Sequence, residues 1–313
     1  MKYSSTAPVK ILVIGAGGTG GYVIPHLYRL GYASGRPVRI IVCDGDIVEE
    51  KNLIRQNFVE QDIGRNKAQV QAERYSAAFG IECEYIPDFI ESDEKLLELT
   101  TPDFFARPHG NIPETQRVIL LGCVDNNRSR QMCHRIFQLQ EDLVYIDSGN
   151  GEHTGQVVCG VRQKGRTTYK PVGSLYPDIL REEDKFPSEL SCAERTVSAP
   201  QSVTANLTAA TAMVGFLYNL LIVGELNTRY VTFSSKQINM RAEITKKRER
   251  SKSSKSKDRK EQIHARVKKF RYVLRGTSLP DRRTERHAQD CKGQGENTEW
   301  QAESRPLGYA LCF

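Results

Sequence analysis

The feature that most constrains the fold is a glycine-rich turn that directly follows a short apolar run. The run Val9–Ile14 reads VKILVI, and the turn Gly15–Gly20 reads GAGGTG. When a buried strand feeds a helix through such a turn, the backbone N–H groups at the helix start face a phosphate. We therefore expect a strand at Val9–Ile14, a helix at Gly18–Leu30 and a bound nucleotide. A plain tight turn is the alternative.

Similar apolar runs alternate with amphipathic stretches further along the chain. The expected strands are Val38–Cys43, Glu82–Ile86, Arg117–Leu121, Leu143–Ile146, Gly155–Val161 and Arg229–Ser234. The expected helices are Lys67–Phe79, Glu91–Leu99, Asn127–Gln138 and Gln201–Val223. This alternation predicts an α/β fold with a doubly wound, Rossmann-like, mostly parallel sheet and later strands in mixed orientation. The polar stretch 163–200 shows no clear periodicity and is expected to be a crossover loop.

Charge divides the chain into two parts. Residues 241–313 hold 20 Lys and Arg against 10 Asp and Glu, a net charge of +10, whereas residues 1–240 hold 25 against 28, a net charge of −3. The tail is poor in aliphatic residues, so it buries too little apolar area to offset its ordering entropy. We expect one domain over 1–240 and, over 241–313, a disordered basic tail or a lone solvated helix. The tail would contact nucleic acid nonspecifically or is an aberrant extension.

The sequence also indicates a cellular compartment. It has no uninterrupted run of 18 apolar residues, so we do not expect a membrane span. Its first ten residues, MKYSSTAPVK, contain no apolar h-region and lead straight into a strand, so we do not expect a secretory signal. Eight scattered cysteines without a C-x-x-C pair are typical of reduced thiols and give no support for a zinc ribbon. We expect a cytoplasmic protein.

Polar residues follow the ends of the expected strands. Asp44 follows Val38–Cys43, and Asp125 follows Arg117–Leu121. Ligands of doubly wound sheets bind at the carboxyl ends of strands near a switch in strand order, so these residues should meet the glycine turn at one edge. Taken singly, Asp44 suits NAD as well as ATP, and Asp125 is also placed to cap the helix from Asn127.

Two cations distinguish between nucleotides. Arg55 lies within the segment Asn52–Gln56, NLIRQ, and Lys67 begins an expected helix. Seen alone, they are equally consistent with a surface turn and a solvated helix end. A nicotinamide enzyme does not need an Arg and a Lys that converge on one triphosphate, whereas an enzyme that transfers a nucleotide onto an acid does.

Four motifs resemble, in order, those of the adenylation domain shared by ThiF, MoeB, HesA and the ubiquitin-activating enzymes. They are GxGGxG at 15–20, DxDxVexxNLxRQ at 44–56, GxxKA at 64–68 and DNxxxR at 125–130. The resemblance implies ATP-dependent adenylation of the C-terminal carboxylate of a small ubiquitin-like or sulfur-carrier protein. It also implies a homodimer in which an arginine of the partner subunit reaches the ATP.

The resemblance assigns roles to single residues. It implies that Asp44 binds the ribose, that Arg55 and Lys67 bind phosphates, and that Asp125 holds Mg²⁺. The full expected nucleotide-binding set is Gly15, Gly17, Gly18, Gly20, Asp44, Asp46, Asn52, Arg55, Gln56, Lys67, Asp125, Asn126 and Arg130. Because a carboxylate that attacks a phosphate is an anion approaching an anion, charge neutralisation is required rather than an acid or a base. We expect His26, His134 and His153 to be ordinary helix or loop residues.

The chain departs from the family pattern in two places. Bacterial sulfur-carrier activators commonly hold zinc in two CxxC pairs; this chain has neither, so no structural zinc is expected. Cys192, within LSCAER, lies in the region where ubiquitin-activating enzymes place a transfer cysteine. It is expected either to accept the activated acyl group or to be an ordinary loop cysteine. SCAER with the later APQS resembles ThiF-like proteins of bacterial PRTRC systems, which are encoded near E2-like and JAB-like partners.

Three other functions stay open. One is adenylation of a non-protein carboxylate, on a small molecule or a modified tRNA. Another is a non-catalytic nucleotide-binding scaffold. A dehydrogenase on the same fold is the third, which Arg55, Lys67 and Asp125 disfavour.

Overall fold

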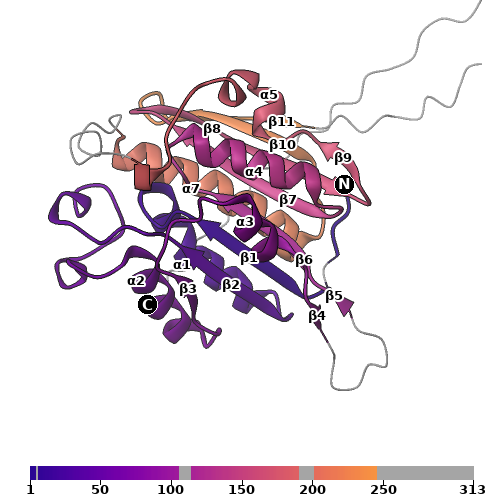
Figure 1. The fold of residues 1–313 in the computed structure, drawn as a ribbon, viewed down its shortest axis with the longest axis horizontal. Helices are drawn as coiled ribbons and strands as arrows, with labels where there is room; N and C mark the ends of the chain where they lie inside the picture. Colours follow the sequence, from indigo (N-terminus) through magenta and orange to yellow (C-terminus); the bar gives the residue numbers. More distant parts are fainter. Residues whose placement is uncertain (5, 106–113, 190–200, 245–313) are drawn as a thin grey trace, which may run out of the picture. The chain divides into compact units, whose positions relative to one another are not determined.

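A nine-stranded sheet forms the centre of the fold (Figure 1). The computed structural model describes residues 1–4, 6–105, 114–189 and 201–244. The strand order is β11-β10-β8-β7-β6-β1-β2-β3, with β9 paired to β8. The strands are β1 Val9–Ile14, β2 Val38–Cys43, β3 Glu84–Ile86, β6 Arg117–Gly122, β7 Leu143–Asn150, β8 Thr154–Gln163, β9 Arg166–Tyr169, β10 Thr228–Ser234 and β11 Asn239–Ile244.

The strand order confirms the predicted architecture. β1 pairs in parallel with β2 on one side and with β6 on the other. The chain therefore changes direction across the sheet beside β1, and the carboxyl ends of β6, β1 and β2 lie next to each other. The later strands are mixed as expected: β7 joins β6 in parallel, whereas β8, β10 and β11 add antiparallel.

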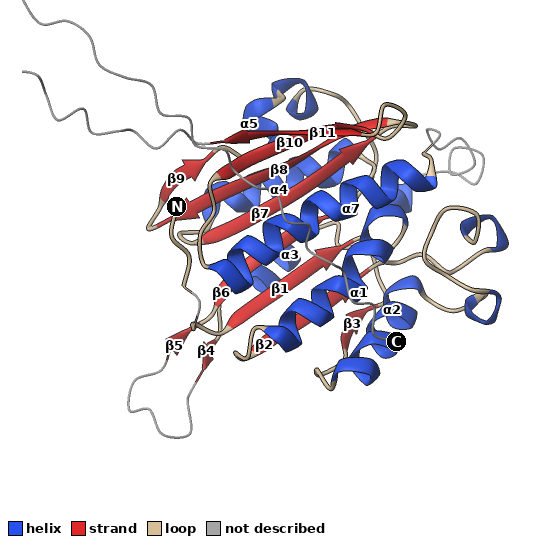
Figure 2. Cartoon of the chain, turned by 180° about the vertical axis from the view of Figure 1, so that it is seen from behind, coloured by secondary structure: helices blue, strands red, loops and turns tan. Residues whose placement is uncertain are grey.

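Helices cover both faces of the sheet (Figures 1 and 2). One face carries α1 Gly18–Ala33, α2 Lys67–Phe79 and α7 Val203–Tyr218, and the other carries α3 Asp93–Thr100, α4 Asn127–Leu139 and α5 Val172–Leu175. Each face has its own apolar core, because β1 and β6 are buried on both sides and send alternate side chains to each. Short helical turns lie in the connections: η1 Glu50–Asn52, η2 Glu60–Asp62, η3 Pro177–Leu180 and η4 Pro187–Glu189.

Helix α7 continues as a π-helical turn, η5 Asn219–Val223. In the described part of the chain, Val203–Val223 is the one helical stretch long and apolar enough to cross a membrane by length and composition. Half of that stretch is buried inside the fold, where it packs on α1, β7 and β8. A core helix of this kind passes the same test as a membrane span.

Several elements were not predicted. The hairpin β4 Phe104–Phe105 and β5 Glu114–Thr115 precedes β6, and the stretch expected to lack periodicity contains β9 and α5. β11 was also missed. Its sequence NMRAEI alternates polar and apolar residues, but all six residues are exposed, and residues 241–244 fall in the stretch that was expected to be the basic tail. The strand forms by pairing its backbone with β10. Strands of this kind depend on a neighbour, because their own side chains bury little apolar area.

Three of the cysteines are buried thiols, as expected: Cys43, Cys133 and Cys159. Cys83 is exposed and Cys123 is half-buried. The first four residues of the predicted tail, 241–244, belong to β11 instead of a disordered tail or a lone helix. Residues 245–313 and Cys192 lie outside the described residues, so their expected order and role stay predictions.

Candidate nucleotide site

In the glycine turn between β1 and α1, backbone atoms pack directly against other backbone atoms. Gly15 has a φ of +94°, and a Cβ there would lie 2.6 Å from the carbonyl oxygen of Cys123. A Cβ on Gly20 would lie 2.0 Å from the carbonyl oxygen of Gly15. Neither position tolerates a side chain, because both neighbours are backbone atoms. No described side chain caps the first turn of α1, so its N–H groups are available to an anion.

Asp44 fastens this turn to the end of β2. Its carboxylate accepts hydrogen bonds from the backbone N–H of Ala16 at 2.7 Å and of Asp46 at 2.9 Å. Burial raises the pKa of the Asp44 carboxyl, and the nearby Lys67 opposes that shift. Each oxygen keeps a second lone pair, which suits a sugar hydroxyl.

The arginine segment lies against the glycine turn. Asn52 is buried and accepts from the backbone N–H of Glu49 at 2.9 Å, which shapes the loop. The side-chain amide of Gln56 is buried beside Gly17, with Oε1 3.5 Å from where a Cβ would be. That oxygen has no hydrogen-bond partner among the described residues. A buried unpaired polar atom beside a glycine turn fits a group that contacts a ligand.

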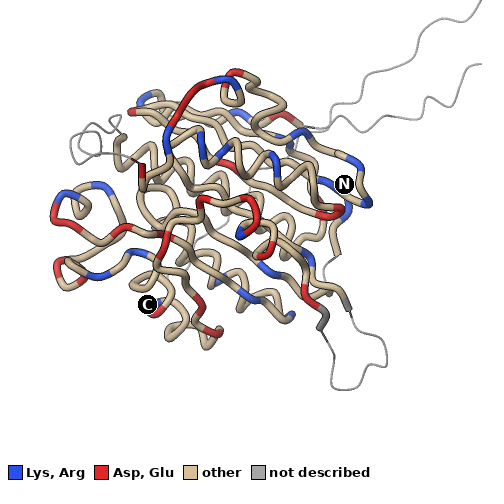
Figure 3. Tube along the Cα trace, viewed as in Figure 1, with Lys and Arg blue, Asp and Glu red and all other residues tan. Residues whose placement is uncertain are grey.

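Lys67 comes to the same edge from the start of α2. Asn66 caps this helix by accepting from the backbone N–H of Gln69 at 3.0 Å. The Lys67 side chain is only 7% exposed, and its ammonium lies 2.9 Å from the half-exposed carboxylate of Asp46. The loop between β2 and α2 carries charges of both signs (Figure 3).

Asp125 stands on the turn after β6. The cap of α4 is Asn126, whose side chain accepts from the backbone N–H of Ser129 at 2.7 Å. The alternative that Asp125 itself caps this helix is therefore wrong. Asp125 is exposed and presents a carboxylate at the edge that bears the glycine turn.

Arg130 holds the turn that carries Asp125 in place. It is buried and donates to the carbonyl oxygens of Val124 at 2.6 Å and Ser148 at 3.1 Å. Its Nε lies 3.3 Å from Oδ1 of Asp147. The other carboxylate oxygen of Asp147 accepts from the Tyr145 hydroxyl at 2.8 Å. Burial raises the pKa of Asp147, although Arg130 and Tyr145 oppose that shift. The turn that carries Asp125 thus rests on a buried ion pair.

Sequence reasoning missed Asp147 and three amides near Arg55: Asn150, Gln201 and Asn206. The Arg55 guanidinium donates to Oε1 of Gln201 at 3.0 Å. No local pattern marks these residues, because each acts on a segment remote in sequence.

The histidines are placed as expected. His26 lies exposed on α1, and His153 lies in the loop after β7, 3.3 Å from Glu152. His134 is on α4, where burial lowers its pKa. All three are helix or loop residues.

The described residues hold no group of three or more His, Cys, Asp or Glu side chains arranged to bind a metal. Mg²⁺ does not need such a group, because it is usually bound by one or two carboxylates together with substrate phosphates. The single exposed carboxylate of Asp125 fits that requirement.

Comparisons with known proteins show a family match over most of the chain. A family model described as the ThiF family matches residues 4–257. The chain is 30% identical over 162 residues to SUMO-activating enzyme subunit 2 of Dictyostelium discoideum, which covers 50% of this chain and 21% of that protein. It is 39% identical over 71 residues to the NEDD8-activating enzyme E1 catalytic subunit of Saccharomyces cerevisiae, 22% of each chain. The chain thus spans about a fifth of the length of these relatives.

Solved structures share the fold. PaaA matches with a TM-score of 0.51 and 17% identity over 76% of this chain and 64% of that chain. MccB of E. coli with ATP matches with a TM-score of 0.50 and 20% identity over 77% of this chain and 65% of that chain.

Proposed function

We propose that this chain, which belongs to the ThiF family, transfers AMP from ATP to the C-terminal carboxylate of a small ubiquitin-like or sulfur-carrier protein. A carboxylate oxygen attacks the α-phosphorus, an acyl-phosphate bond forms, and the bond to pyrophosphate breaks. The observation that carries the proposal is the meeting of the glycine turn, Arg55, Lys67 and Asp125 at the carboxyl ends of β1, β2 and β6.

Each residue has a part in this reaction. The first turn of α1 faces the phosphates with N–H groups, and Asp44 accepts the ribose hydroxyls. Arg55 and Lys67 neutralise phosphate charge. Asp125 would hold Mg²⁺, which would supply positive charge between the two anions when bound. Asn52, Gln56 and Arg130 keep the loops in place.

The nature of the acyl substrate rests on the relatives. The SUMO- and NEDD8-activating enzymes are named for small ubiquitin-like proteins, and this favours a protein carboxylate. Adenylation of a peptide or small-molecule carboxylate is the second candidate, because the motifs for ATP are the same in both cases.

The test is ATP–pyrophosphate exchange by the purified protein with a small protein that ends in Gly-Gly and is encoded beside it. Exchange should require the free C-terminal carboxylate, so the same protein with a C-terminal amide is the matched control. Exchange with short peptides or amino acids alone would select the second candidate. Absence of exchange with every carboxylate would overturn the proposed reaction.

We also propose that Cys192 accepts the acyl group from AMP as a thioester. Cys192→Ser should keep pyrophosphate exchange and lose any thiol-sensitive adduct with the small protein, measured by gel electrophoresis with and without reductant. An adduct that persists in this variant would place the nucleophile on another residue or another protein. As in the PRTRC-type resemblance, an E2-like protein is then the expected acceptor.

A further inference from the structure

Two buried amides connect the arginine segment to helix α7. Asn206, in the second turn of α7, has no exposed surface. Its Nδ2 donates to the main-chain carbonyl of Arg55 at 3.3 Å, and its Oδ1 accepts from Nδ2 of Asn150 at 2.7 Å. Asn150 is the last residue of β7, so the pair spans three separate segments.

The same pair holds the glycine turn. The hydroxyl of Thr19 donates to Oδ1 of Asn150 at 3.3 Å. A Cβ on Gly18 would lie 2.8 Å from Nδ2 of Asn206, so the turn packs directly on this amide. The arginine segment and the glycine turn are thereby fixed against one common support.

The guanidinium of Arg55 is held from the same helix start. Gln201 accepts from Arg55 at 3.0 Å, and its own Nε2 lies 3.4 Å from the carbonyl oxygen of Asn150. The main-chain carbonyl of Arg55 therefore contacts Asn206, and its guanidinium contacts Gln201, which in turn contacts Asn150.

Packing alone does not require these amides. The other buried residues of α7 are all apolar: Ala205, Ala209, Ala210, Ala212, Met213, Phe216 and Leu217. A buried amide must keep hydrogen-bond partners to avoid a desolvation penalty, and the Nδ2 of Asn206 finds its acceptor in the segment that carries Arg55.

We propose that Asn206, together with Asn150, is a positioning residue for the nucleotide site: it sets where Arg55 and the glycine turn stand relative to the phosphates. This inference rests on the proposed function for the identity of the ligand. It assigns to α7 a part in the nucleotide site that the sequence motifs do not mark.

The experiment is a calorimetric measurement of the Kd of a non-hydrolysable ATP analogue with Mg²⁺. Asn206→Ala should raise the Kd about tenfold, since displaced binding groups lose much of their interaction energy. Thr211→Ala is the matched control, because its hydroxyl bonds only within α7, to the carbonyl of Leu207 at 2.8 Å. That variant should stay within about twofold of wild type.

A double-mutant cycle separates positioning from general damage. If Asn206 acts through the Arg55 side chain, Asn206→Ala should change the Kd less than about twofold in an Arg55→Ala background. An equal loss in both backgrounds would overturn the role of Asn206 in positioning Arg55 and leave only its contact with the glycine turn. An unchanged Kd in the single variant would overturn the whole inference. Gln201→Ala is the second variant in case Asn206→Ala does not fold; it should weaken binding about threefold, and wild-type affinity there would count against the inference.

Binding and exchange separate this inference from the proposed function. Wild-type protein that binds the analogue without pyrophosphate exchange would overturn the proposed reaction while the Kd comparison still decides the role of Asn206. Normal exchange with equal Kd values would overturn only the role of Asn206. No binding of the analogue by the wild type would overturn both.

Discussion

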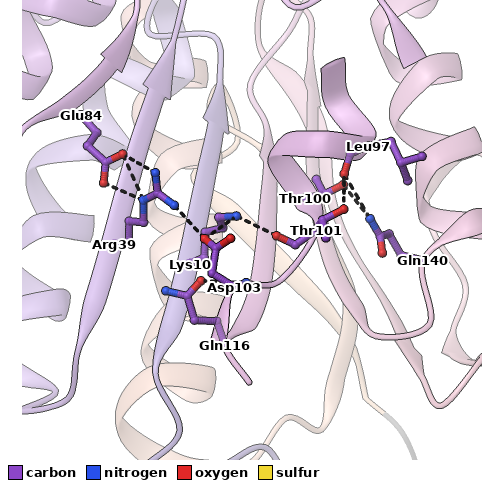
Figure 4. Close-up of polar contacts among 9 residues, drawn as sticks. All are labelled: Lys10, Arg39, Glu84, Leu97, Thr100, Thr101, Asp103, Gln116 and Gln140. Atoms are coloured by element: carbon purple, nitrogen blue, oxygen red, sulfur yellow. Dashed lines mark hydrogen bonds and ion pairs between the residues drawn. The ribbon is translucent and has the colours of Figure 1, made fainter. Parts of the chain in front are cut away.

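The charged side chains at the two ends of the parallel strands differ in how completely they are paired. At the amino ends, Lys10 of β1 and Arg39 of β2 pair with Asp103 and Glu84 (Figure 4). The Nε of Arg39 donates to both carboxylate oxygens of Glu84, at 2.7 and 3.0 Å, and its Nη1 donates to Asp103 at 2.8 Å. Lys10 additionally donates to the carbonyl of Thr101 at 2.7 Å. Two cations and two anions satisfy one another.

At the carboxyl ends the charges are only partly paired. Arg55 donates to a neutral amide, Lys67 pairs with a half-exposed Asp46, and Asp125 is exposed. The supports beneath them are buried: Asp44 fixes the glycine turn, and Arg130 with Asp147 fixes the turn of Asp125. Charges that neutralise one another stabilise a fold, whereas charges that are held in place without being fully neutralised are arranged for a ligand. Substitutions at the two ends should therefore affect different properties.

The largest effect is expected at Asp125. Asp125→Ala should lower ATP–pyrophosphate exchange by at least about a hundredfold, because an electrostatic group at a charged transition state is lost. The melting temperature should stay near that of wild type, because the carboxylate is exposed. Asp103→Ala is the matched carboxylate at the opposite end and should leave exchange unchanged. Equal loss of exchange in both variants would contradict the division between the two ends.

The next effect compares two buried lysines, Lys67 at 6% and Lys10 at 3% exposure. Lys67→Met should weaken binding of the ATP analogue about tenfold or more, the value of a hydrogen bond to a charged group. Lys10→Met should leave that affinity unchanged and lower the free energy of unfolding by about 1 kcal/mol, discounted because Asp103 is half-exposed. Calorimetry and urea unfolding measure the two quantities. A loss of affinity in Lys10→Met would show that the ends are coupled.

The sequence predicted the elements whose signal is local. β1 and β6 are apolar runs buried on both faces, and the glycine turn lies directly after the first, so both the sheet and the phosphate edge followed from short stretches. β2 and α2 have the predicted bounds. α1 runs three residues past its predicted end at Leu30, because Gly31 still faces Val38 and Ile81 and Leu30 still packs against the same core.

What escaped prediction depends on contacts between distant segments. Asn206 reads as a polar interruption in an apolar helix, and only the fold shows that it meets Arg55, 151 positions away. Lys10 is the one charged residue in the apolar run Val9–Ile14, and only the fold shows that Thr101 and Asp103 are its partners. Partners this remote leave no periodicity in either segment.

The smallest effect concerns the acid stability of the amino ends. Hydrogen bonding from Lys10 holds the pKa of the Asp103 carboxyl below its ordinary value, and partial burial opposes this. A carboxyl whose pKa is lowered on folding stabilises the fold above its ordinary pKa of about 4, and that contribution disappears as the pH falls through the lowered pKa. Asp103→Asn should therefore be less stable than wild type at pH 7, by less than about 1 kcal/mol. The difference should shrink below pH 4, when wild type also becomes neutral at this site. Urea unfolding at pH 7, 5 and 3 measures it, with Asp178→Asn as the control, because its carboxylate is 85% exposed in its pair with Arg181. A difference that stays constant down to pH 3 would mean that Asp103 contributes through its shape rather than its charge, and the ion-pair account of the amino ends would fail.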